Sequence, residues 1–208
     1  MGRDSRYLGW TGAALLAMTA AAAGCRSQPA DLTDVLTGDE LARTWAPSNY
    51  RTWIPAQAVL ATAELRGDSL TVRNIRNSQY LNADDYVVRY HDKTFDLRKL
   101  RSVDFVTVPF QDSPTLAHTM LSFGFDDGEF LAVSVEARYE EGETYSPVKG
   151  ALRQYELIYV VADERDVIVL RAKHRKDDVY LYRTRATPEL ARALLLDVMA
   201  RANKLAAA

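Results

Sequence analysis

A hairpin over residues 117–138 holds the residues of this sequence with the clearest potential for chemistry. Its sequence, AHTMLSFGFDDGEFLAVSVEAR, contains two apolar strands joined at the residues DDG. This turn fits a three-residue hairpin loop with Gly128 in the left-handed conformation. His118 lies in the first strand and Glu136 in the second, so an imidazole and a carboxylate are predicted on neighbouring strands.

The length of the loop fixes which residues face one another across the hairpin. With three loop residues, Phe123 pairs with Leu131, and apolar side chains meet along one face. His118 and Glu136 then share the other face, where a carboxylate can reach an imidazole across the strand pair. Such a carboxylate holds the ring in one tautomer and stabilises its protonated form, as in a nucleophile–base–orienter arrangement. The alternative is a solvated sheet face without a chemical role.

A general base needs a nucleophile, and the sequence offers none beside the hairpin. The one cysteine of the chain is Cys25. Ser122 lies on the same strand as His118 but about 13 Å further along it. The chain has no HExxH or GxSxG motif and no phosphate-binding loop, so neither a metal nor an organic cofactor is indicated. His91 and His174 lie among charged residues, and we expect both at the surface.

Residues 1–24 are predicted to be an export signal that ends at a lipobox. Arg3 and Arg6 precede an uncharged segment of apolar and small residues. The small residues before Cys25 resemble a bacterial lipobox, which would make Cys25 the lipidated N-terminus. A plain secretory signal or a single membrane anchor is the alternative. Arg26 favours sorting to the outer membrane in a Gram-negative cell, and residues 25–38 are predicted to be the lipidated tether.

Charge and composition narrow the classes of function. The net charge of -2 at pH 7, without a long run of one sign, argues against nucleic-acid binding. The 11 tyrosines favour a β-rich domain over a helical bundle. If Cys25 carries a lipid, no thiol remains for an internal disulfide or a cysteine-ligated zinc site.

Local patterns predict an α+β domain over residues 39–208, with a mostly antiparallel β-sheet and a C-terminal helix packed on one face. Thr187 caps that helix and Pro188 suits its first turn. Apolar residues recur along it at helical spacing: Leu190, Leu194, Val198 and Leu205. Expected elsewhere are a short helix over 36–45, an irregular segment over 49–63 with room for a short helix, and strands within 69–75, 85–97, 103–110, 155–174 and 178–184. The segment 155–174 is read as two strands that turn at DERD.

Several segments, taken in order, resemble the Lnb N-terminal periplasmic domain family. The similarity covers most of residues 39–206 and is most specific in HTMLSFGFDDGE and RQYELIYVVADERDVI. It implies a protein on the periplasmic side of the cell envelope of Gram-negative bacteria. It also implies similarity to permuted papain-like folds, such as the NlpC/P60 and lecithin:retinol acyltransferase groups. The activity implied is thiol-dependent transfer of an acyl chain from a phospholipid to an amine, through a thioester.

The sequence differs from the family pattern at the nucleophile. His118 matches the histidine of the family, whereas the family cysteine, in an NNC-like motif beyond the long helix, has no counterpart here. We expect an incomplete fold that is truncated at the C-terminus. Loss of the nucleophile with retention of the fold is the alternative.

The expected function is that of a periplasmic domain of an envelope lipoprotein, similar to a thiol-dependent lipoprotein or phospholipid acyltransferase. His118 is the expected catalytic base and Glu136 its orienting partner. The alternative is a non-catalytic envelope protein that binds lipid acyl chains or lipoprotein N-termini in an apolar groove beside Met120 and the C-terminal helix. A structural envelope protein is a third reading. A polar cluster after the hairpin is expected to contact a lipid headgroup: Tyr145, Lys149, Arg153 and Tyr155.

Overall fold

The computed structural model describes residues 47–111, 113–143 and 155–208. These residues belong to one compact unit, Ala42–Ala208. Several predictions lie outside the described residues. They are the export signal, Cys25 with its tether, the helix expected over 36–45, and three members of the polar cluster, Tyr145, Lys149 and Arg153.

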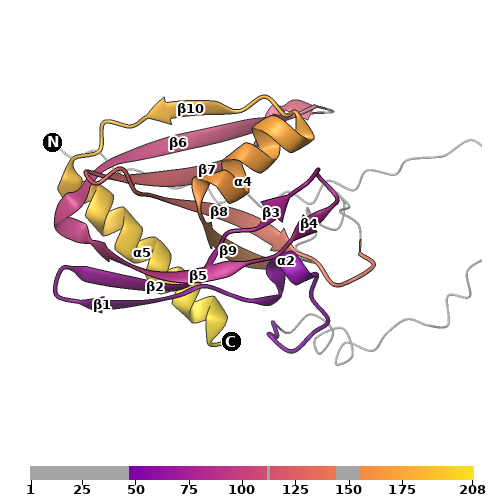
Figure 1. Ribbon diagram of the computed structural model, residues 1–208, viewed down its shortest axis with the longest axis horizontal. Coiled ribbons are helices and arrows are strands. Elements are labelled where there is room, and N and C mark those ends of the chain that lie inside the picture. Colours follow the sequence, from indigo (N-terminus) through magenta and orange to yellow (C-terminus); the bar gives the residue numbers. More distant parts are fainter. Residues whose placement is uncertain (1–46, 112, 144–154) are drawn as a thin grey trace, which may run out of the picture. The chain divides into compact units, whose positions relative to one another are not determined.

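An eight-stranded sheet forms the centre of this unit (Figure 1). The strand order is β1-β2-β9-β8-β7-β6-β10, and β5 pairs with β2. The strands are β1 (Thr62–Arg66), β2 (Ser69–Arg76), β5 (Tyr90–Asp96), β6 (Leu100–Phe110), β7 (Ser113–Phe125), β8 (Phe130–Arg138), β9 (Glu156–Ala162) and β10 (Tyr180–Arg183). Strands β3 (Gln79–Tyr80) and β4 (Tyr86–Val87) form a separate small hairpin. Apart from one parallel contact between β2 and β9, all pairs are antiparallel, which confirms the predicted α+β class.

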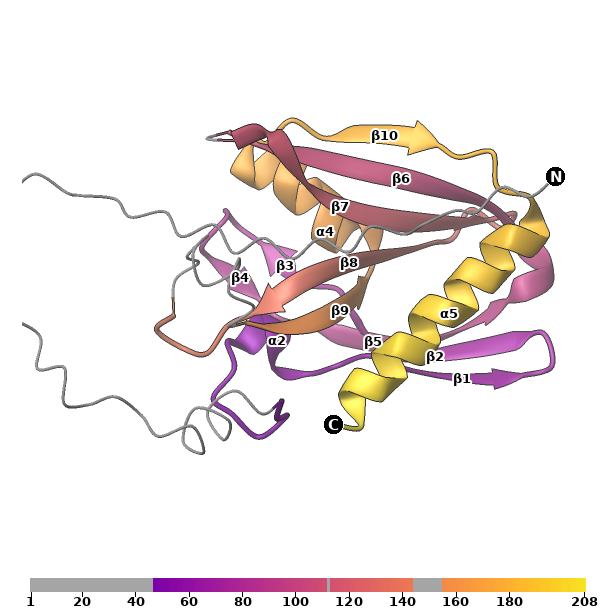
Figure 2. The same ribbon diagram turned by 180° about the vertical axis from the view of Figure 1, so that it is seen from behind.

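Helices cover the two faces of the sheet, as the opposite views in Figures 1 and 2 show. On one face lies α5 (Pro188–Ala206). On the other lies α4 (Glu164–Val169), which continues as the π-helix η2 (Leu170–Arg175). Two short helices, α2 (Pro55–Ala58) and η1 (Leu97–Lys99), complete the described elements. We call the two sides of the sheet the α5 face and the α4 face.

The C-terminal helix forms as the sequence predicts. The Thr187 hydroxyl accepts a hydrogen bond from the Leu190 backbone N–H, and Pro188 occupies the first turn. The buried stripe agrees with the predicted one only at Val198. The other buried residues of the helix are Ala191, Leu195, Met199 and Ala202. Leu190 is 62% exposed. The prediction of a helix on one sheet face is therefore confirmed, while its apolar stripe was only partly identified.

The β7–β8 hairpin has the predicted register. Phe123 pairs with Leu131 and Met120 with Ser134. Gly128 has φ +80°, and the Phe125 N–H donates to the Glu129 carbonyl across the loop. Because side chains alternate along a strand, this register separates the apolar residues on the α5 face from His118 on the α4 face.

The secondary structure agrees with the prediction in one segment and differs in another. Residues 49–63 were expected to be irregular with room for a short helix, and they contain α2, with β1 beginning at Thr62. Residues 155–174 were read as two strands, but only β9 is a strand, and the chain then turns into α4 and η2. Glu164 and Asp166 lie in the first helical turn and basic residues end η2, which matches the polarity of the helix dipole. The β-branched residues of VIV favour a strand, so the sequence pattern did not indicate this helix.

Candidate functional site

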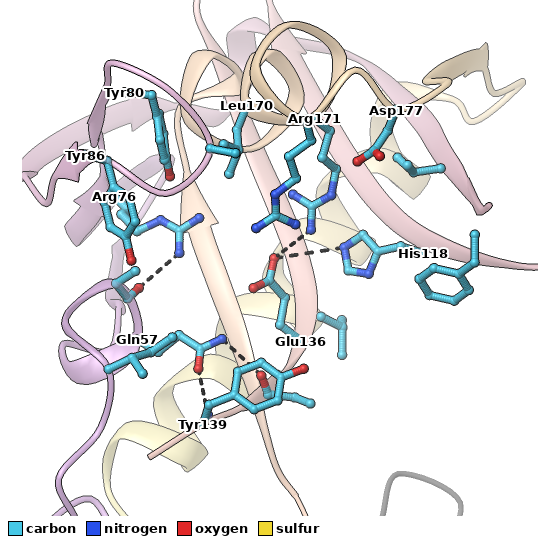
Figure 3. A pocket seen from close by; sticks show the side chains of 18 of the residues that line it. Gln57, Arg76, Tyr80, Tyr86, His118, Glu136, Tyr139, Leu170, Arg171 and Asp177 are labelled. Carbon is cyan, nitrogen blue, oxygen red and sulfur yellow. Dashed lines mark hydrogen bonds and ion pairs between the residues drawn. The ribbon is translucent and has the colours of Figure 1, made fainter. Parts of the chain in front are cut away.

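A cavity of about 520 Å³ opens on the α4 face (Figure 3). Its walls come from α2, the β3–β4 hairpin, η2 and parts of β6, β7 and β8. A volume of about 300–1,000 Å³ is typical of small-molecule sites. The apolar part of the lining includes Ile54, Val108, Pro109, Phe110, Val135 and Leu170. The titratable part includes Arg76, His118, Glu136, Arg171, Arg175 and Asp177.

The structure brings His118 and Glu136 to the same side of the sheet, as the hairpin register predicts. The His118 Nε2 atom lies 4.0 Å from the Glu136 Oε1 atom, which is too far for a hydrogen bond. Ser134 bridges the two. Its Oγ atom lies 2.7 Å from His118 Nε2 and donates a hydrogen bond of 2.8 Å to Glu136 Oε1. Glu136 therefore acts on the imidazole through a serine that sequence reasoning missed.

Arg171 anchors the carboxylate from the opposite side. Its Nη2 atom donates to Glu136 Oε1 at 3.1 Å, and its Nη1 atom donates to the Val167 carbonyl at 3.0 Å. Figure 3 shows this guanidinium and the His118 ring converging on Glu136. The sequence prediction missed Arg171 because it read this segment as a strand. The acidic start and basic end of residues 163–175 were the signal that could have identified the helix.

The electrostatic environment keeps His118 neutral. Burial lowers the pKa of His118 to about 4, with further lowering by Arg171 and Arg175 and partial compensation by Glu136. Burial acts in the opposite sense on Glu136, but the charges of Arg171 and Arg76 outweigh it and lower the pKa of Glu136 to about 2. At neutral pH the site thus holds a neutral imidazole beside an ionised carboxylate.

A second buried ion pair shapes the wall of the cavity. The Nε atom of Arg76 donates to Asp166 Oδ1 at 2.9 Å, and its Nη1 atom donates to the Ala56 carbonyl at 3.0 Å. Asp166 also accepts hydrogen bonds from the Ser78 backbone N–H and the Tyr80 hydroxyl. A buried charge needs such partners because its desolvation is costly. This network fixes Arg76 in the lining, and it joins β2, α2 and the β3–β4 hairpin to α4.

The remaining predicted residues are placed as follows. The Tyr155 ring lies 5.3 Å from the ring of Tyr139, a cavity residue, and Tyr155 is not itself part of the lining. The prediction of an apolar groove beside both Met120 and the C-terminal helix is wrong. Met120 packs on the α4 face, whereas α5 covers the opposite face of the sheet. His91 is also less exposed than predicted and lies 3.7 Å from Asp163.

Neither a membrane-spanning helix nor a metal-binding cluster occurs among the described residues. None of their helices is long and apolar enough to cross a bilayer. They also hold no cluster of three or more histidine, cysteine or acidic side chains arranged to bind a metal ion.

Comparison with known proteins gives one match. The sequence profile of the Lnb N-terminal periplasmic domain family matches residues 86–208. Searches among curated proteins and among solved structures gave no significant match. The matched range contains His118, Ser134, Glu136 and Arg171, whereas Arg76 and the first two strands precede it.

Proposed function

Because this chain belongs to the Lnb N-terminal periplasmic domain family, and is thus a periplasmic domain of an envelope protein, we propose that His118 is the general base of a thiol-dependent acyl transfer. The observation that supports this role is a neutral, partly exposed imidazole at the wall of a cavity, with an ionised carboxylate and an arginine behind it. A general base must be unprotonated before the reaction, and a pKa of about 4 keeps His118 in that form at neutral pH.

The proposed reaction has two steps. A thiol gives its proton to His118, and the thiolate attacks the carbonyl carbon of an acyl ester. The alcohol then leaves with the proton that His118 returns, which produces a thioester. An amine attacks the thioester in the second step, His118 takes the amine proton and passes it to the departing thiolate, and an amide and a free thiol result. A thiolate beside the ring stabilises the imidazolium, so we expect the pKa of His118 to rise once the thiol is in place.

The thiol is the component that the described residues do not contain, since the one cysteine is Cys25. We propose that the thiol comes from another chain, because the sulfur of Cys25 is the proposed site of a lipid. The apolar wall around Val108, Phe110 and Val135 suits an acyl chain, and Arg175 suits the phosphate of a phospholipid donor. The acceptor is proposed to be an amine, such as a lipoprotein N-terminus.

We also propose that Cys25 carries a lipid that anchors the domain to the outer membrane. The small residues before the cysteine support this proposal. The full chain should then partition with membranes, and a Cys25→Ser variant should be recovered in the periplasmic fraction. Recovery of both proteins in the same fraction would exclude the anchor.

An exogenous thiol can test the role of His118 without the missing nucleophile. The purified full chain is mixed with 2-mercaptoethanol and micelles of phosphatidylethanolamine that carries a labelled acyl chain, and the labelled thioester is measured. We expect His118→Gln to reduce the rate about tenfold or more, because general base catalysis contributes at least that much. His91→Gln, at a histidine outside the cavity lining, is the matched control. Equal rates in both variants would overturn the proposal.

A second candidate is a non-catalytic domain that binds the same amphiphile. The proposed lipid on Cys25, the one cysteine of the sequence, favours this reading because it leaves no free thiol in the sequence. It predicts that the protein binds phosphatidylethanolamine with a measurable Kd in native mass spectrometry and forms no thioester with added thiol. His118→Gln would then leave the Kd within about twofold, because a neutral ring contributes little to binding an anion.

A further inference from the structure

We propose that Ser134 is a positioning residue that fixes His118 in its Nε2–H tautomer and so directs the other nitrogen, Nδ1, to the reacting thiol. The tautomer follows from hydrogen-bond geometry alone, whereas the role of Nδ1 rests on the function proposed above. The sequence prediction gave this positioning role to Glu136, in direct contact with the ring. The structure instead places a buried hydroxyl between them.

The Ser134 hydroxyl has a single hydrogen, which allows only one direction for its two hydrogen bonds. An ionised carboxylate can only accept hydrogen bonds, and a serine hydroxyl has a single proton to donate. That proton goes to Glu136 Oε1 at 2.8 Å. The His118 Nε2 atom is 2.7 Å from the same hydroxyl oxygen, which can now only accept. Nε2 must therefore carry the hydrogen, and in a neutral imidazole Nδ1 then holds the lone pair.

This arrangement of hydrogen bonds requires that Glu136 is ionised, and Arg171 keeps it so. Its guanidinium contacts the same carboxylate oxygen as Ser134, and the Val167 carbonyl holds its other branch in place. A protonated Glu136 could donate to Ser134 and reverse the chain of hydrogen bonds. The charges of Arg171 and Arg76 prevent this by lowering the pKa of Glu136. The direction of the chain is thus set by an arginine three hydrogen bonds away from the ring.

Burial removes the competing partners. Ser134 is 0% exposed, so water does not compete for its proton or its lone pairs. The opposite tautomer would place the lone pairs of Nε2 and the hydroxyl oxygen against each other, or else leave the carboxylate without its serine. Since a buried polar group without its partner is strongly disfavoured, the Nε2–H form should prevail by roughly tenfold or more.

Nδ1 is left available by the same arrangement. Within the described residues it makes no hydrogen bond, and the His118 side chain is 18% exposed at the cavity wall. Figure 3 shows one ring nitrogen turned to Glu136 and the other on the far side of the ring. A thiol that enters the cavity would meet the lone pair of Nδ1, while Ser134 and Glu136 stabilise the proton on Nε2 as charge develops.

The direct test is nuclear magnetic resonance of the full chain with 15N-labelled histidine at neutral pH. We expect an Nδ1 shift typical of an unprotonated nitrogen and an Nε2 shift typical of N–H. Ser134→Ala should reduce the tautomer ratio by roughly tenfold. Ser122→Ala is the matched control, because Ser122 is an equally buried serine on the neighbouring strand and donates to Glu164 instead. It should leave the His118 signals unchanged.

The outcomes separate this inference from the proposed function. A protonated Nδ1 in the unmodified protein overturns the inference, and this measurement needs no variant to fold. The expected tautomer together with no His118-dependent thioester formation leaves the assignment intact and overturns the function. If both hold, Ser134→Ala should lower kcat about tenfold at unchanged KM, and Ser134→Thr should restore it. A changed tautomer with unchanged kcat would overturn the positioning role.

Discussion

The two faces of the sheet are held together by different kinds of interaction. On the α5 face, Leu195 and Met199 pack against Phe123, Leu131 and other apolar side chains. On the α4 face the apolar cluster is smaller, and buried polar residues adjoin it: Arg76, Ser78, Ser122, Ser134, Asp166 and Arg171. Contact between apolar side chains is tolerant of small shifts, whereas buried charges demand fixed partners. The α5 face can therefore supply stability, while the α4 face holds its polar side chains in defined orientations.

This difference predicts how each face responds to substitution. On the α5 face the cost of a change should follow the volume removed. On the α4 face it should follow the number of partners left without a hydrogen bond, and one altered residue should disturb groups several bonds away. Substitutions on each face would test that contrast.

The largest loss of stability is expected from Asp166→Ala on the α4 face. This change leaves the buried Arg76 charge without its carboxylate, and it removes the acceptor of the Ser78 N–H and the Tyr80 hydroxyl. Breaking a buried pair from one side costs about 3–5 kcal/mol. Denaturant unfolding would measure it. Asp197→Ala, in an exposed pair with Arg201, is the control and should cost far less, because water screens this pair. A cost at Asp166 as small as the control would contradict the contrast.

A comparable loss is expected from Leu195→Ala on the α5 face, where the cause is a cavity. Leu195 is fully buried in the cluster beneath α5. Truncation of such a residue costs about 2–5 kcal/mol. Leu190→Ala on the same helix changes an exposed side chain and should stay within about 0.5 kcal/mol. The His118 tautomer should be unaffected by either change, and a shift in its 15N signals would show that the faces are coupled.

Acid should weaken the α4 face before the α5 face. In the unfolded chain His118 takes up a proton below about pH 6.5, while the folded protein resists protonation until about pH 4. The free energy of unfolding should therefore be constant above pH 6.5 and fall as the pH drops toward 4. The depressed pKa corresponds to roughly 3 kcal/mol. Unfolding of the His118→Gln variant, measured across this range, should lack this part of the slope. An unchanged slope would exclude His118 as its source.

Glu136 adds a second acid-sensitive contribution with the same sign. Its folded pKa of about 2 lies below the ordinary value of 4.5, so its contribution is complete above pH 4.5 and is lost as the pH falls toward 2. The two windows separate the residues, since His118 acts at higher pH than Glu136.

The sequence predicts the α5 face well and the α4 face poorly, for a physical reason. Thr187, Pro188 and the spacing of apolar residues in α5 are local signals, and the hairpin register follows from its loop and its alternation. The α4 face depends on partners far apart in the sequence, such as Arg76 with Asp166 and Arg171 with Glu136. No local pattern specifies them. His118 and Glu136 were found because a hairpin makes their contact local, while Ser134 was missed because the register places it opposite Met120 and not opposite His118.

The smallest expected effect concerns the loop on which the separation of the faces depends. Gly128 has φ +80°, which disfavours any side chain, so Gly128→Ala should cost about 1 kcal/mol and Gly128→Asn less. Neither change should alter the register, because a slip by one residue would move Phe123 and Leu131 out of the α5 core and place polar residues there. Amide signals of β7 and β8 would measure the pairing, and the His118 tautomer would report the α4 face. A register that changed with Gly128 would mean that the loop, and not the burial pattern of the strands, determines which face carries the imidazole.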